Sequence, residues 1–418
     1  MTLDTSASAA VSEARLQRRH DLLGAIGATP RGGVNRLALT TTDATAQAML
    51  VDWALQRGFG CSRDEIGNLY IRREGSQPGL DPVFMGSHLD TQPTGGRFDG
   101  AYGVLAGFEV LEALADLGRP TRRPVEVVAW TNEEGSRFQP GCMGSAAFTG
   151  VFPLERMLAA KDRDGITVGE ALAAVDGATP LPTRPMASVR PSAYLEAHIE
   201  QGPRLESAGA TIGVVSGIQG IRRLAVSVHG EEAHAGTTPR AVRRDAVSAA
   251  VAVIGALEAL LHDADDTVRF TVGRMEVAPN SPNTVPSRVE FSIDLRHPDA
   301  GTLRTLGDRI EALACEAART RRCTATVTQV SHVQPTVFAD ATVSLVREAT
   351  RALGYPCLEM PSGAGHDAMY LSRICPTAMV FVPCLGGVSH NEAESATAAD
   401  LAAGTRVLAA ALVALADA

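Results

Sequence analysis

The stretch Gly86-Ser-His-Leu-Asp-Thr-Gln-Pro-Thr-Gly-Gly-Arg-Phe-Asp-Gly-Ala-Tyr-Gly103 organises the rest of the chain. An apolar run before it, Pro82–Met85, predicts a short buried strand. His88 and Asp90 would then lie at the carboxyl end of that strand, where open α/β sheets usually bind their ligands. Asp99 follows in a glycine-rich turn, ahead of a periodic apolar segment that predicts a buried helix. An imidazole and a carboxylate arranged in this way can converge on one cation, although a purely structural His–Asp pair is the alternative.

A second strand pattern, Val125–Trp130, ends in Thr131-Asn-Glu-Glu-Gly135. Because side chains alternate along a strand, Glu133 and Glu134 are expected to point in different directions. One carboxylate can then bind a metal while its neighbour stays free to transfer protons. The pair Glu231–Glu232 lacks this context and is interpreted as a solvated loop without a role.

Two further segments supply side chains that bind metals, Glu196–Gly202 and Gly387–His390. The candidate ligands are His88, Asp99, Glu134, His198 and His390. Histidines and carboxylates without a thiolate suit Zn, Mn, Co or Ni. With Asp99 able to bridge, the sequence predicts a site for one or two divalent ions per subunit.

Length and composition limit the class of protein. The chain has 418 residues, more than one ordinary core accommodates, so two domains are expected. The net charge of −9 offers no electrostatic basis for binding nucleic acid. No apolar stretch reaches the length of a membrane span. The first dozen residues lack the order of a signal peptide and are expected to form a frayed tail.

Cysteine and lysine usage argues against covalent catalysis. The seven cysteines include no C-x-x-C pair, which favours free thiols in a reducing cytoplasm. Cys142 follows the two glutamates, but no neighbouring basic motif supports a nucleophilic role. The single lysine, Lys161, lies in a polar charge cluster, and there is no G-x-S-x-G pentad. Most covalent mechanisms are therefore excluded.

Periodicity also indicates how the domains are organised. Strands alternate with helices up to about residue 212, as in α/β proteins. The following segment has alternating strands and two long helical patterns, about Arg240–Leu261 and Thr302–Thr320, which predicts an antiparallel sheet with both helices on one face. Candidate ligands lie on both sides of this insert. Residues 1–212 and 331–418 are therefore expected to form the metal-binding catalytic domain, and residues 213–330 a separate lobe.

The order of the motifs resembles a known family. The motifs are His-Leu-Asp (88–90), Gly-Arg-Phe-Asp-Gly (96–100), Asn-Glu-Glu-Gly (132–135), Glu-x-His-Ile-Glu-Gln-Gly (196–202), His-Ala-Gly-Thr-Thr-Pro (234–239), Arg-His-Pro (296–298) and Ser-Gly-Ala-Gly-His-Asp (362–367). Over nearly its whole length the chain is similar to the amidohydrolase branch of the M20 metallopeptidase family. That branch contains N-carbamoyl-L-amino-acid hydrolases, β-ureidopropionases and allantoate amidohydrolases. Typical M20 peptidases carry a carboxylate ligand where this chain has His198 with Gln201, which is the amidohydrolase pattern.

The resemblance implies a two-domain α/β fold. Its catalytic domain has a mixed sheet of the zinc-aminopeptidase type, and its inserted α+β domain forms the homodimer and closes over the site. Glu133 is implied to be the general base. His234 is implied to polarise the scissile carbonyl, in its own subunit or across the dimer.

The resemblance also implies a substrate pocket. Asn283 and Arg296 are expected to hold the substrate carboxylate, a role that suits the fork of an arginine. Gln201 and Gly365 are expected to complete the pocket. His366 is either a wall of the pocket or a support behind it.

The predicted function is metal-dependent hydrolysis of a linear amide or ureido bond in a small carboxylated substrate. An N-carbamoyl-L-amino acid, giving the amino acid, carbon dioxide and ammonia, is the first candidate. Allantoate, N-carbamoyl-β-alanine and ureidoglycine are alternatives that the same anchoring residues would serve. A dipeptidase is disfavoured by Gln201 and by Asn283 with Arg296. A binding or scaffold protein would lack a ligand or the base, and none is missing. The enzyme is expected to be a cytoplasmic homodimer.

Overall fold

The computed structural model describes residues 3–418. The chain divides into two compact units: unit 1 comprises Met1–Ser216 with Phe338–Ala418, and unit 2 comprises Gly217–Val337. Both units combine helices with a sheet, so the predicted mixed α/β class is confirmed.

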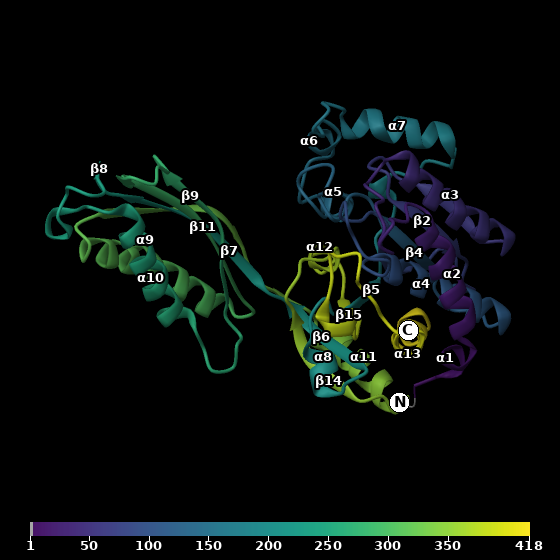
Figure 1. The fold of residues 1–418 in the computed structure, drawn as a ribbon. Coiled ribbons are helices and arrows are strands. Elements are labelled where there is room, and N and C mark those ends of the chain that lie inside the picture. Colours follow the sequence, from purple (N-terminus) through teal and green to yellow (C-terminus); the bar gives the residue numbers. More distant parts are fainter. Residues whose placement is uncertain (1–2) are drawn as a thin grey trace. The chain divides into compact units, whose positions relative to one another are not determined.

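Unit 1 is built on a nine-stranded mixed sheet with the order β1-β2-β4-β3-β5-β15-β6-β13, in which β14 also pairs with β6 (Figure 1). The short edge strand β13 consists of the last two residues of unit 2. The strands are β1 (Gly60–Arg63), β2 (Leu69–Arg73), β3 (Val83–His88), β4 (Val125–Trp130), β5 (Ala193–Ile199), β6 (Ile212–Ile218), β13 (Thr336–Val337), β14 (Cys357–Ser362) and β15 (Thr377–Val382). The central strands β4, β3, β5 and β15 are parallel to one another and buried along their whole length. Their continuous burial accounts for their apolar runs. The pair β6–β13 carries the chain into and out of unit 2.

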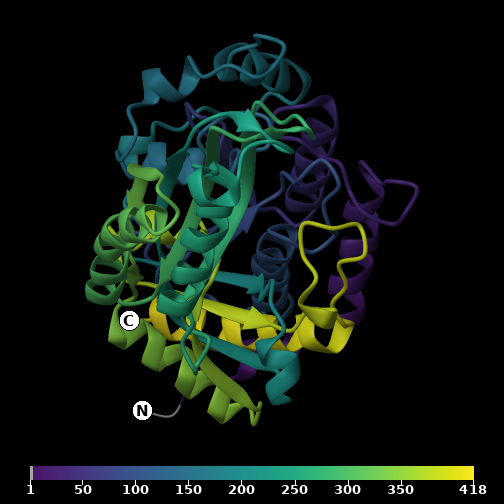
Figure 2. The same ribbon diagram turned by 60° about the vertical axis from the view of Figure 1, so that its left-hand side comes forward.

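Helices cover this sheet, with α4 and α13 packed against the central strands and against each other (Figures 1 and 2). The helices are α1 (Ser6–Ala10), α2 (Glu13–Ala25), α3 (Thr41–Gln56), α4 (Ala101–Asp116), α5 (Met143–Phe148), α6 (Leu154–Leu158), α7 (Val168–Ala178), α8 (Arg204–Ala208), α11 (Asp340–Ala352), α12 (Ala368–Leu371) and α13 (Ala398–Ala416), with short 3-10 turns η1 (Met186–Ser188) and η3 (Leu385–Gly387). The expectation that no apolar stretch reaches the length of a membrane span is wrong for α13, which alone among the described residues is long and apolar enough to cross a membrane. Of that stretch, 67% is buried within the protein. Burial of this extent is typical of a core helix.

The expectation of a frayed amino-terminal tail is wrong for residues 6–10. These residues form α1, in which Ala7 is fully buried. The Ser8 hydroxyl donates a hydrogen bond of 2.7 Å to the carbonyl oxygen of Arg406 on α13. Small side chains let α1 approach α13 closely, and a five-residue segment of serine and alanine has no apolar periodicity that would have predicted it.

Unit 2 contains a four-stranded antiparallel sheet with the order β12-β7-β11-β9. Its elements are β7 (Gly220–His229), β8 (Ala233–His234), η2 (Arg240–Val242), α9 (Ala246–Leu261), β9 (Arg269–Ala278), β10 (Thr284–Val285), β11 (Arg288–His297), α10 (Ala300–Arg319) and β12 (Thr324–Val333). Alternate β11 residues, such as Phe291 and Ile293, share one apolar core with residues of both helices. The alternating pattern therefore predicted this sheet and its helical face correctly. The first helix begins later than predicted, at Ala246, because Asp245 caps it by accepting a hydrogen bond from the Ser248 amide.

Gly86 provides a test of the central sheet. It has φ of +145°, and a Cβ at this position would lie 1.9 Å from the carbonyl oxygen of Val128 on β4. Because the obstacle is main chain, no side-chain rotation can relieve it. We expect Gly86→Ala to lower the free energy of unfolding by about 2–4 kcal/mol, measured as a fall in the thermal midpoint. Gly79→Ala, which meets nothing within 4 Å, is the matched control and should leave the midpoint unchanged.

Candidate functional site

The parallel strands of unit 1 bring the candidate ligands to one edge of the sheet. His88 ends β3, His198 lies near the end of β5, and Glu133 and Glu134 follow β4. The neighbouring strand β15 is parallel to β5 and ends eight residues before His390, so the carboxy-terminal ligand returns to the same edge. Residues far apart in the sequence therefore meet here, as the sequence predicted.

The Asp99 carboxylate lies between three imidazoles. Its Oδ1 is 3.2 Å from Nε2 of His198 and 3.6 Å from Nε2 of His88. Its Oδ2 is 3.3 Å from Nε2 of His390, which is itself 3.4 Å from Oε2 of Glu134. Two donor groups thus share Asp99: one with His88 and His198, the other with Glu134 and His390. A carboxylate shared in this way could bridge two cations.

The turn that carries Asp99 requires glycine. Gly100 has φ of +64°, and a Cβ there would lie 2.3 Å from the His88 ring. Gly103, on the first turn of α4, would bring a Cβ within 2.4 Å of the carbonyl oxygen of Ala197. These glycines let α4 begin directly against the strands that carry the two histidines.

Main-chain carbonyls orient the two buried imidazoles. Nδ1 of His88 is 2.8 Å from the carbonyl oxygen of Asp90, and Nδ1 of His198 is 2.9 Å from that of Ile199. A carbonyl oxygen only accepts hydrogen bonds, so Nδ1 carries the proton in each ring. The lone pair of each Nε2 then points toward the donor groups, and that of His198 also accepts a hydrogen bond of 3.2 Å from the Gly100 amide.

Asp90 holds the segment that bears the two glutamates. Its Oδ1 accepts a hydrogen bond of 3.1 Å from the Glu133 amide, and its Oδ2 accepts one of 3.2 Å from the Glu134 amide. Gln92 donates to both carboxylate oxygens of Glu134, from its main-chain amide at 3.1 Å and from its side chain at 2.7 Å. The sequence placed Asp90 at the strand end without assigning it a role, and Gln92 was missed.

Glu394 is a second supporting residue that the sequence did not reveal. Its Oε1 accepts hydrogen bonds from the amides of Phe98 (2.9 Å) and Asp99 (3.0 Å), and its Oε2 accepts one from the Ser389 hydroxyl (3.0 Å). Glu394 thereby fixes the Asp99 turn from a segment almost three hundred residues away. No local pattern signals such a contact.

Glu133 stands beside the donor groups. Its Oε2 is 3.5 Å from Nε2 of His88, and its Oε1 accepts a hydrogen bond of 3.2 Å from the Cys142 thiol. Burial raises the pKa of the Glu133 carboxyl well above its usual range, and nearby carboxylates including Asp367 raise it further. The pKa of the Cys142 thiol is also raised, by burial and by Glu133. A thiol of this kind is a hydrogen-bond donor and a poor nucleophile.

The donor set fits divalent cations. Burial, followed by the charge of Asp99, raises the pKa of Glu134 to about 7. The hydrogen bond to Asp99 raises the pKa of His390 to about 8. These shifts reflect carboxylates crowded together away from water, and a divalent cation would stabilise their ionised forms. Imidazole and carboxylate donors suit Zn, Mn, Co or Ni, and they do not select one of these.

Gln201 lies beside Asp99. Its side-chain amide donates to Oδ2 of Asp99 (2.9 Å) and to the Ser389 hydroxyl (3.1 Å). Its carbonyl oxygen is buried and has no hydrogen-bond partner among the described residues. Gln201 therefore touches the donor groups directly and keeps one acceptor available.

The loop before His366 lies behind His198. The two rings make an edge-on contact with centroids 4.5 Å apart, and Nε2 of His366 lies 2.9 Å from the Ser362 hydroxyl. Burial lowers the pKa of His366 well below its usual range, which favours the neutral ring. These contacts indicate a support for His198. Gly365 is exposed in the same loop.

In unit 2, β8 pairs with β10 and brings His234 next to Asn283, whose carbonyl oxygen accepts a hydrogen bond from the Ala235 amide (3.0 Å). The His234 side chain is exposed. Arg296 occupies the other end of the four-stranded sheet, where it pairs with Ile221 at the start of β7. Its guanidinium donates to both carboxylate oxygens of Asp294, at 2.7 and 3.3 Å.

The length of β11 separates these residues. Arg288 begins the strand on the side of β8 and β10, and Arg296 follows eight residues later. At about 3.4 Å per residue, this spacing amounts to about 27 Å. One chain therefore does not bring Arg296 together with Asn283 and His234 around a single small molecule.

Comparison with known proteins identifies the family. Residues 84–414 match the model of peptidase family M20/M25/M40. The chain belongs to this family. The resemblance inferred from the motifs is thereby confirmed.

Several M20 relatives are similar over almost the whole chain. The chain is 39% identical over 383 residues to an N-carbamoyl-L-amino-acid amidohydrolase of Rhizobium meliloti, covering 92% of this chain and 91% of the relative. It is 34% identical over 387 residues to an allantoate amidohydrolase of Bacillus subtilis, covering 92% and 93%. The crystal structure of an amidase of the hydantoinase/carbamoylase family from Burkholderia multivorans matches with a TM-score of 0.93, at 44% identity and 98% coverage of both chains.

Asp90 provides a test of the donor geometry. We expect Asp90→Ala to weaken divalent metal binding about 10–100-fold, because the segment bearing Glu134 loses its anchor. The measurement is metal content per chain after dialysis against a graded chelator. Asp164→Ala, at an exposed position outside the site, is the control and should bind metal like the parent. Unchanged metal binding in Asp90→Ala would show that Glu134 keeps its position without the hydrogen bonds from Asp90.

Proposed function

We propose that this M20 protein hydrolyses a linear carbon–nitrogen bond in a small carboxylated ureido or amide compound, with N-carbamoyl-L-amino acids as the substrate class. The observation that carries this proposal is the Glu133 carboxylate standing beside donor groups that share Asp99. Relatives named N-carbamoyl-L-amino-acid amidohydrolase support the substrate class. Relatives named allantoate amidohydrolase make allantoate the second candidate.

The five donors would hold one or two divalent cations, with Asp99 as the bridge. His88 and His198 would complete one site, and Glu134 and His390 the other. Such a cation, when bound, supplies Lewis acidity toward a carbonyl oxygen and lowers the pKa of water. Gln201, which already donates to Asp99, would offer its free carbonyl oxygen to the amino group of a substrate.

Glu133 would act as the general base and then as the general acid. It accepts a proton from the attacking water and returns it to the leaving nitrogen, which departs as the amine of the amino acid. A divalent cation beside Glu133 would favour its ionised form, which is the form that accepts the proton. The other product, carbamate, decomposes to carbon dioxide and ammonia.

The residues of unit 2 would bind the substrate. His234 would donate a hydrogen bond to the carbonyl oxygen as negative charge develops on it. Arg296 would hold the substrate carboxylate, with Asp294 fixing the direction of its fork. Asn283 lies next to His234 and would contact the substrate together with it. Gly365, which has no side chain, would leave room for the substrate.

A small substrate that touches both Arg296 and His234 requires two copies of the chain, because about 27 Å of β11 separates these residues within one copy. We therefore propose a homodimer formed through unit 2, in which His234 and Asn283 serve the partner's site. The exposed face of α9, where Val251 is 65% exposed, and the outer edge of β9 are available for this contact. We also propose that the enzyme is cytoplasmic, since all seven cysteines are free thiols.

The function is tested by ammonia release. We expect chelated enzyme, reconstituted with Zn, Mn, Co or Ni, to release ammonia from an N-carbamoyl-L-amino acid faster than from allantoate, N-carbamoyl-β-alanine or ureidoglycine. Glu133→Gln should lose at least about a thousandfold in kcat while its metal content stays normal, because only the proton acceptor is removed. Faster turnover of a dipeptide, or equal loss of metal from Glu133→Gln, would contradict the proposal.

The two-chain site is tested by mixing inactive variants. We expect His234→Ala and Arg296→Ala to be inactive separately. After subunit exchange at equal amounts, the mixture should recover about one-quarter of the parental activity, because half of the dimers are hybrids with one intact site each. Exchange is verified with differently tagged chains. Hybrid dimers without activity would mean that both residues serve the site of their own chain.

A further inference from the structure

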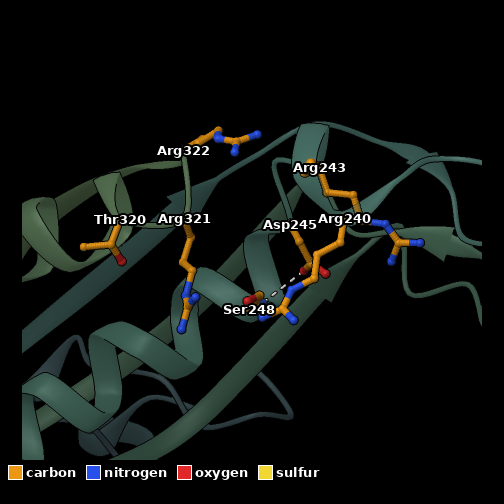
Figure 3. A pocket seen from close by; sticks show the side chains of 8 residues that line it. Arg240, Arg243, Asp245, Ser248, Thr320, Arg321 and Arg322 are labelled. Atoms are coloured by element: carbon orange, nitrogen blue, oxygen red, sulfur yellow. Dashed lines mark hydrogen bonds between the residues drawn. The ribbon is translucent and has the colours of Figure 1, made fainter.

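A hollow at the beginning of α9 brings together several arginines (Figure 3). It is lined by Arg240, Ala241, Arg243, Asp245, Ser248, Thr320, Arg321 and Arg322. Arg243 differs from its neighbours because it is half-buried and its side chain extends away from Arg321 (Figure 3). Its contacts lie in the turn that follows His234.

The Arg243 guanidinium ties the two ends of this turn. Its Nε donates a hydrogen bond of 2.8 Å to the carbonyl oxygen of Thr238, and its Nη2 donates one of 2.5 Å to that of Ala235. The Thr238 amide also donates to the carbonyl oxygen of His234 (3.1 Å), which closes the turn. A planar guanidinium can make both contacts at fixed angles, whereas the ammonium of a lysine cannot reproduce that fork.

The closed turn determines which nitrogen of His234 carries the proton. Nδ1 of His234 faces the amides of Gly236 and Thr237, at 3.0 and 3.1 Å. Two N–H donors require a lone pair at Nδ1, so the neutral ring carries its proton on Nε2. The imidazole is exposed and Nε2–H is its free donor. This is the form that can donate a hydrogen bond to a developing oxyanion.

We propose that Arg243 is a positioning residue for hydrolysis, which holds the turn 235–238 so that two main-chain amides fix His234 as the Nε2–H tautomer. The turn is exposed and contains Gly236, so it has little core packing to maintain its shape. Without Arg243 the amides would move off Nδ1, and the proton would distribute over both nitrogens. This inference rests on the role proposed for His234.

The kinetic test compares Arg243→Ala, Arg243→Lys and the control Arg240→Ala, which removes an exposed arginine from the same hollow. We expect Arg243→Ala to lower kcat about tenfold or more with a much smaller change in KM and normal metal content, because an oxyanion donor acts mainly in the transition state. Arg243→Lys should fall between it and the parent. Arg240→Ala should remain within about twofold of the parent, since loss of positive charge alone should matter little.

The spectroscopic test measures the tautomer directly. Two-bond 1H–15N correlation spectra of the full-length enzyme with [15N]histidine, with His234 assigned by difference from His234→Gln, should show proton-bearing Nε2 and bare Nδ1 in the parent. Arg243→Ala should show a mixture of tautomers. The fold of each variant is checked by circular dichroism, and Arg243→Gln replaces Arg243→Ala in both tests if the latter does not fold.

The outcomes separate this inference from the proposed function. An unchanged tautomer in Arg243→Ala overturns the inference, whatever happens to kcat. A shifted tautomer with unchanged kcat supports positioning by Arg243 but overturns the role given to His234, and His234→Ala would then also retain activity. A shifted tautomer with a lower kcat supports both.

Discussion

The structure of unit 1 depends on one buried carboxylate, Asp99, surrounded by three imidazole nitrogens. A carboxylate removed from water is costly unless it is hydrogen-bonded or paired, so its surroundings must be built accurately. Glycine at position 100 lets the turn press against the His88 ring. Glu394 holds the main chain of the turn from the far end of the sequence. Each of these features exists because the Asp99 oxygens must face different histidines.

The parallel strands of the central sheet bring the donor residues of this cluster together. Strands β4, β3, β5 and β15 end at a common edge, although a whole second unit is inserted between β5 and β15 in the sequence. The insertion leaves the edge intact because the chain leaves through β6 and re-enters through β13, which pairs with it. The donors can therefore be distant in sequence while the sheet fixes their separation.

Much of the site was predictable because strand ends carry a local signal. A buried apolar run that ends in a polar side chain marks His88, and the same logic marks Glu134, which is followed by a glycine. The alternation along β11 likewise predicted a sheet with helices on one face. Supporting residues such as Glu394 and Gln92 gave no such signal, because they act through contacts between distant segments that no periodicity encodes. The short helix α1 was missed because its serine and alanine side chains are small and show no apolar periodicity, although two of them are buried. The separation of Arg296 from Asn283 became visible only when the strand register was known.

The ten-residue strands β7 and β11 are paired without a break in register, from His229 opposite Arg288 to Gly220 opposite His297. The length of these two strands sets the distance between the turn that follows His234 and the guanidinium of Arg296. Adding one residue to either strand would turn its later side chains to the opposite face. Adding two residues to each strand would restore the faces but lengthen the pair as a whole by about 7 Å. Exchange of this lobe between family members is therefore limited by strand length.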